Sequence, residues 1–93
     1  MDILQEDNGT KGHFYIALDG KEIAAMHYVY SGPHQFIIDH TEVAEAFEGR
    51  GLGKQLLNAT VKFARNKGMK IIPLCPYAKS VFDKSPEISD VLV

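Results

Sequence analysis

Apolar and polar residues alternate in the first half of the chain, over residues 13–18, 21–30 and 35–43. A period of two is typical of strands that bury one face. The dipeptide Asp19-Gly20 favours a two-residue type I′ hairpin, because both central positions of that turn need positive φ. Residues 1–5 are a candidate edge strand. The pattern therefore predicts an antiparallel meander with short connections.

The spacing changes after residue 43. Apolar residues at helical intervals predict an amphipathic helix over residues 52–67, with Gly68 as its stop. Residues 69–74 form a short apolar strand, so strand, helix and strand make a βαβ unit with Ile71 and Ile72 parallel to residues 36–43. We expect residues 78–84 to form two helical turns and residues 88–93 a final strand. The predicted fold class is α/β, a mixed sheet in which the meander precedes the βαβ unit and a short C-terminal helix.

The strand over residues 35–43 ends in polar residues. In a regular strand one face carries Phe36, Ile38, His40 and Glu42, and the other carries Ile37, Asp39, Thr41 and Val43. A bulge would redirect the last residues, and the strand's own pattern leaves that open.

A glycine-rich turn, Glu48-Gly49-Arg50-Gly51-Leu52-Gly53-Lys54, joins this strand to the helix. At a helix N-terminus the free N–H groups and the dipole favour an anion, so the turn is a candidate phosphate site. The alternative is an ordinary glycine-rich loop. Gln55 follows Gly53-Lys54 where a P-loop needs Ser or Thr, and the spacing of the glycines does not fit a dinucleotide fingerprint.

Composition and charge narrow the function classes. With 93 residues we expect a single domain over residues 1–93. A net charge of −2 gives no basic field for nucleic acid, and no segment is long enough to cross a membrane. One cysteine excludes an internal disulfide, and with no signal peptide at the N-terminus we expect a cytoplasmic protein, monomeric or weakly dimeric. His13, His27 and His34 are scattered along the chain, so we predict no metal site.

In the order of its predicted strands and helices, and in two motifs, the chain resembles the general N-acetyltransferase (GNAT) superfamily. The pyrophosphate loop of that family reads Gln/Arg-x-x-Gly-x-Gly/Ala; here Gly51 and Gly53 fit, while Glu48 departs from it. After the next strand many members carry an Asn, a small residue and a Tyr, where this chain has Cys75, Ala78 and Phe82. The resemblance covers roughly residues 13–84 and is greatest to the small YjdJ-type branch, without the helix pair that usual members carry between their first two strands.

The resemblance implies acetyl-CoA as co-substrate and an amine as acceptor. The pantetheine arm would pair with the backbone near Thr41 and Val43. The pyrophosphate would lie on the turn, and two aromatic residues would pack against the cofactor. The implied cofactor-binding residues are Thr41, Val43, Gly49, Arg50, Gly51, Leu52, Gly53, Lys54, Tyr77 and Phe82.

Three residues are candidates for the chemistry. His40 or Glu42 would serve as the base that deprotonates the amine, or would merely face solvent at a polar strand end. Cys75 would protonate the departing sulfur or accept the acetyl group covalently; alternatively it is a small buried hydrophobe. The favoured function is an acetyl-CoA-dependent N-acetyltransferase. A non-catalytic acetyl-CoA or CoA sensor and a plain interaction domain are the alternatives.

Overall fold

The computed structural model describes residues 2–93 and contains a five-stranded sheet in the order β1-β2-β3-β4-β5. The strands are β1 Leu4–Asp7, β2 Lys11–Leu18, β3 Lys21–Tyr30, β4 Gln35–Val43 and β5 Lys70–Pro73. The first four pair antiparallel, and β5 pairs parallel to β4 with Phe36 opposite Ile71. The predicted meander and βαβ unit are confirmed. The edge strand expected at residues 1–5 is β1, and Met1 lies outside the described residues.

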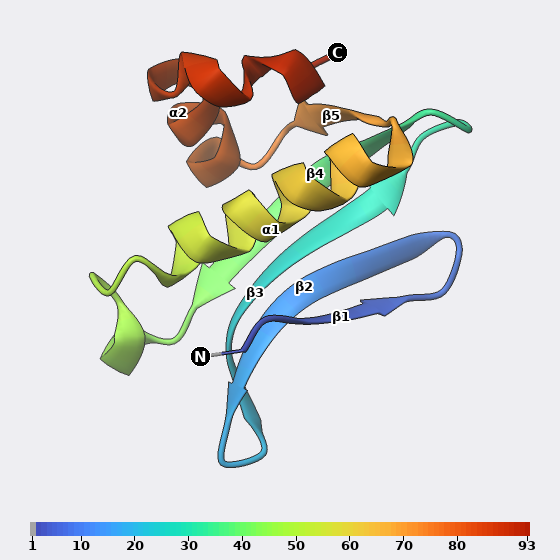
Figure 1. The fold of residues 1–93 in the computed structure, drawn as a ribbon. Helices are drawn as coiled ribbons and strands as arrows, with labels where there is room; N and C mark the ends of the chain where they lie inside the picture. The colour runs from blue at the N-terminus through green and yellow to red at the C-terminus, as the bar shows by residue number, and fades with distance from the viewer. Residues whose placement is uncertain (1) are drawn as a thin grey trace.

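The helical elements are the short η1 Glu45–Phe47, α1 Leu52–Lys67, α2 Pro76–Lys84 and η2 Pro86–Val91. Helix α1 crosses one face of the sheet, whereas α2 and η2 lie beside β5 (Figure 1). Both hairpin residues have the predicted positive φ, 52° at Asp19 and 79° at Gly20. The mixed α/β fold expected from the sequence is therefore confirmed.

The core lies between α1 and the sheet. Leu56 and Leu57 are fully buried, each contributing about 1.5–3 kcal/mol relative to an exposed side chain. They belong to a cluster that includes Tyr28 and Phe36 from the strands. Helix α1 has the predicted bounds, and the Gly68 N–H donates to the carbonyls of Ala64 and Arg65 at its end. The apolar stripe read from the sequence is thus the face of α1 that packs on the sheet.

A β-bulge at Asp39 changes the faces of β4. His27 pairs with His40 but Tyr28 pairs with Ile38, so β4 has one extra residue there. Phe36 and Ile38 are buried on the α1 side, and beyond the bulge that side is occupied by Thr41 and Val43. The prediction that His40 and Glu42 share a face with Phe36 and Ile38 is wrong. The bulge turns them to the face that α1 leaves open.

The final strand predicted at residues 88–93 is also wrong. Residues 86–91 form the 3-10 helix η2, whose buried residues are Ile88 and Val91. A spacing of three fits a 3-10 helix, because its side chains at i and i+3 lie above one another. Arg65 fixes η2 to α1 with a bidentate ion pair to Asp90, 2.7 Å at the closer oxygen. Only Leu92 forms a bridge to β5, opposite Ile71.

Candidate functional site

The glycine turn lies between η1 and α1. Gly49 and Gly51 have φ values of 77° and 74°, in the left-handed region that favours glycine. Gly51 is the N-cap of α1, where no side chain caps the helix and no acidic residue lies in the first turn. The N–H groups of this turn therefore lack a side-chain acceptor. That arrangement is favourable for an anion.

Gly53 lies in contact with Tyr77 at the start of α2. A Cβ atom at Gly53 would lie 2.9 Å from Cζ of Tyr77, so only glycine permits this approach. Burial, and secondly the nearby Cys75, raises the pKa of the Tyr77 phenol, which therefore stays protonated at neutral pH. The phenol is thus a hydrogen-bond donor held beside the first turn of α1.

A cavity of about 390 Å³ extends from the turn to β4. Its walls are Thr41, Val43, Phe47, Glu48, Gly49, Gly51, Leu52, Gly53 and Tyr77. Most of the residues that the sequence assigned to a cofactor therefore lie together. Arg50 lies outside the walls with its guanidinium 5.1 Å from the centre of the Phe47 ring, and Lys54 is exposed. Phe82 does not line the cavity, because it is buried in the core.

Strands β4 and β5 part beside this cavity. Their last paired residues are Ile38 and Pro73, and the Ile38 carbonyl then accepts from both Leu74 N–H, at 3.1 Å, and Cys75 N–H, at 2.9 Å. The final residues of β4 consequently have no strand beside them on the β5 side. The Ala44 N–H donates to the Ile23 carbonyl of β3, so the N–H of Val43 points away from β3. An edge of backbone groups is thus available to a ligand.

Cys75 lies at the junction of β5 and α2. It is the N-cap residue of α2 and is 4% exposed, and Pro76 follows it at the first helical position. Its thiol donates to Thr41 Oγ1 over 3.2 Å. The buried small hydrophobe and the reactive thiol considered from the sequence both fit this position, since the thiol is covered yet lies next to a residue of the cavity wall.

The structure does not bring His40 and Glu42 to the cavity. Both side chains lie on the open face of the sheet, with 60% and 57% exposed, and they contact each other over 3.3 Å. Thr41, between them in sequence, points to the opposite side and reaches Cys75. The open face of the sheet and the face covered by α1 adjoin where β4 and β5 separate.

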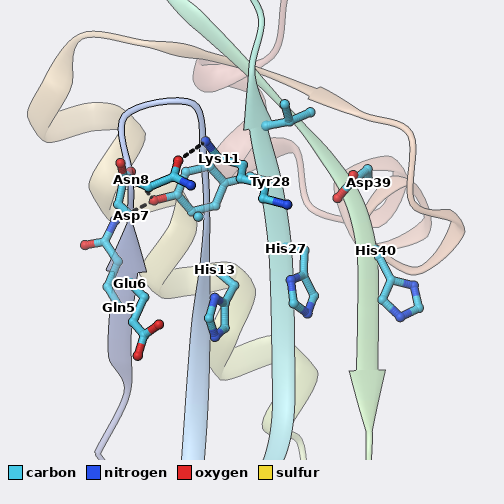
Figure 2. A pocket seen from close by; sticks show the side chains of 12 residues that line it. Gln5, Glu6, Asp7, Asn8, Lys11, His13, His27, Tyr28, Asp39 and His40 are labelled. Carbon is cyan, nitrogen blue, oxygen red and sulfur yellow. Dashed lines mark hydrogen bonds between the residues drawn. The ribbon is translucent and has the colours of Figure 1, made fainter.

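Two of the histidines that the sequence left scattered are neighbours. His13 and His27 are paired across β2 and β3, with ring centres 4.9 Å apart, and His40 continues the row on β4 (Figure 2). The sequence did not predict this pairing, because β3 contains a second bulge, opposite Ile16 and Ala17. This bulge shifts the register between β2 and β3 by one residue. Among residues 2–93 no group of three or more side chains is arranged to hold a metal ion. Nor does any helix in that range have the length and apolarity needed to span a membrane.

Most of this chain is similar to known proteins. Residues 13–91 match the family model described as GCN5-related N-acetyl-transferase. Protein NATD1 of Xenopus tropicalis is 31% identical over 85 residues, which is 90% of this chain and 78% of that protein. A GCN5-like protein from Staphylococcus aureus has 34% identity and a TM-score of 0.79, covering 99% of this chain and 87% of its own.

A more distant neighbour shares the fold. A GNAT family acetyltransferase from Elizabethkingia anophelis with acetyl-CoA bound has 23% identity and a TM-score of 0.61, over 69% of this chain and 42% of its own. The family model and the two relatives above 30% identity carry the assignment. This chain therefore belongs to the GCN5-related N-acetyltransferase family.

Proposed function

We propose that this protein binds acetyl-CoA and transfers its acetyl group to an amine. The observation that carries the proposal is the continuous cavity between the uncapped N-terminus of α1 and the parting of β4 and β5. A pyrophosphate needs N–H donors at one end of the site, and a pantetheine arm needs free backbone partners farther along it. Both are offered along one cavity wall.

The turn would hold the pyrophosphate through the N–H groups of residues 49–54. Arg50 and Lys54 lie close in sequence to those groups and add positive charge. Beyond the turn, the arm would lie along the free edge of β4 in the manner of an added strand. The Val43 N–H, which points away from β3, would then donate to the thioester carbonyl and stabilise the charge that develops on it.

Acetyl transfer requires a proton transfer at the attacking amine and another at the departing sulfur. When the amine attacks the acetyl carbon, the carbon–sulfur bond breaks and its electron pair leaves with the sulfur. The Tyr77 phenol in the cavity wall, or the Cys75 thiol hydrogen bonded to Thr41 of that wall, would protonate it. His40 and Glu42 are the proposed bases for the amine. Both lie on the open face, so the amine would approach the thioester from that side of β4.

A non-catalytic CoA-binding module is the second candidate. One observation favours it: the Cys75 thiol is already hydrogen bonded to Thr41. Membership of the YjdJ-type branch, a single domain over residues 1–93, a cytoplasmic location and a monomer or weak dimer complete the proposal.

Two measurements test the proposal. Isothermal titration with acetyl-CoA should give saturable binding, and no heat at millimolar ligand would refute both candidates. Release of free CoA thiol across a panel of amines then separates enzyme from sensor. Cys75→Ser and His40→Gln that bind normally yet lose turnover support catalysis, whereas wild-type protein that binds acetyl-CoA without turnover supports the sensor.

A further inference from the structure

A row of imidazoles crosses the open face of the sheet. Figure 2 shows His13, His27 and His40 side by side on β2, β3 and β4, in front of the helix that covers the other face. The ring centres are 4.9 Å apart between His13 and His27 and 5.8 Å apart between His27 and His40. The three rings line a groove together with residues of β1.

The carboxylate of Glu42 lies between two of these rings. Its Oε1 is 3.7 Å from Nε2 of His27, and its Oε2 is 3.3 Å from Nε2 of His40. Each oxygen of one carboxylate therefore faces a different imidazole. His40, Glu42 and His27 thus form a continuous row of polar groups on the open face.

Neighbouring side chains fix the position of His27. His13 on β2 stacks against the His27 ring, and its Nε2 lies 2.8 Å from Oε1 of Glu22. The His13 ring also stacks on Tyr15, with ring centres 4.8 Å apart. The other titratable groups lining the groove or the ring row are Glu6, Asp7, Lys11, Tyr15, Tyr28 and Asp39.

We propose that His27 is a positioning residue for the acceptor reaction. It holds Glu42 between itself and His40 and receives the proton that leaves the amine through them. This inference rests on the proposed acetyl transfer and gives that reaction a proton exit. The exit opens into the groove on the face opposite α1, away from the cavity assigned to the cofactor.

The proton balance is simple. The ammonium group of the acceptor gives one proton to Nδ1 of His40, whose Nε2 faces Glu42, and the resulting amine forms its nitrogen–carbon bond. The proton passes from His40 to Glu42, to His27 and then to water in the groove. The second proton of the nitrogen ends on the departing thiolate, giving free CoA thiol and an amide.

The kinetic test compares His27→Gln with the matched control His34→Gln, which lies in the turn between β3 and β4 outside the row. We expect His27→Gln to lower kcat at pH 7 by about tenfold, a part of the usual effect of a general base. The affinity for acetyl-CoA should not change. The deficit should shrink at pH 9, where more of the amine is already unprotonated. Equal rates and pH profiles for the two variants overturn the inference.

A nuclear magnetic resonance spectrum tests the contact without turnover. Glu42→Gln should shift the ring signals of both His27 and His40, because each ring lies beside one oxygen of that carboxylate. Glu48→Gln, which removes a carboxylate at the other cavity, should move neither. A response of His40 alone overturns the role of His27. Wild-type protein that transfers no acetyl group overturns the proposed function itself, so the two failures are distinguishable.

Discussion

Replacing Gly53 with alanine tests the contact between the glycine turn and α2. A methyl group there would meet Cζ of Tyr77 at 2.9 Å, whereas ordinary contact begins at 3.4 Å. The ring must move by roughly half an ångström, and overpacking of this kind costs about 1–3 kcal/mol. Alanine also recovers about 0.5–1 kcal/mol because glycine is a poor helix former. The net expectation is a destabilisation of about 1 kcal/mol.

The sign of the effect should reverse when the ring is absent. In a Tyr77→Ala background the clash is gone, so Gly53→Ala should stabilise by about 0.5–1 kcal/mol through helix propensity alone. Thermal unfolding of the four proteins in the cycle measures this, since 1 kcal/mol shifts Tm by about 4–8 °C in a domain of this size. Gly53→Ala should also weaken acetyl-CoA binding, because the displaced ring belongs to the cavity wall.

The coupling between the two sites is the decisive quantity. A stabilising effect of Gly53→Ala in both backgrounds would refute the close contact. If Gly53→Ala destabilises the wild type and the Tyr77→Ala protein equally, glycine is required here by the backbone and not by the Tyr77 ring.

Three further outcomes are expected. Gly51→Ala should cost about 1–2 kcal/mol in urea unfolding, because its φ of 74° is strained for any residue with a Cβ, and an unchanged midpoint would refute this. Acetyl-CoA affinity measured by titration should fall as salt is raised from 50 to 500 mM, roughly, because phosphate contacts are screened; a constant affinity would point to apolar contacts. Burial acts to raise the pKa of Asp7, but hydrogen bonds from Tyr28 and Tyr30 outweigh it and the pKa lies below its ordinary value of 3.8. The stability that this carboxylate provides is therefore present above that value and is lost as pH falls below it. Asp7→Asn should flatten the acid limb of a curve of unfolding free energy against pH, and an unchanged acid limb would refute this.

Local signals in the sequence were sufficient for α1 and the hairpin. A glycine at each end and apolar residues at helical spacing define α1, and each of these signals lies within the element itself. The Asp19-Gly20 turn is likewise determined by two adjacent residues. The predictions held where the forces that decide the structure act over a few residues.

Predictions failed where a neighbouring strand or helix determines the conformation of a segment. The bulge at Asp39 arises from how β4 pairs with β3, so the alternation of β4 alone assigned His40 and Glu42 to the wrong face. The C-terminal residues form the helix η2, whose Ile88 and Val91 are buried against the rest of the core. In the site, the glycines were evident from the sequence, but the contact of Gly53 with Tyr77 joins residues on separate helices and has no local signal.

The bulge at Asp39 also determines which kind of genetic change can alter this site. Beyond it, Thr41 and Val43 serve one side of the sheet and His40 and Glu42 the other. Deleting Asp39 would close the bulge and keep the pairings beyond it, so His40 would still lie opposite His27 and Thr41 opposite Met26. Deleting Thr41 would instead exchange the faces of the residues that follow, bringing the carboxylate of Glu42 towards the thiol of Cys75. Relatives whose β4 differs by one residue beyond the bulge are thus expected to differ in the chemistry they present, even where their side chains are otherwise alike.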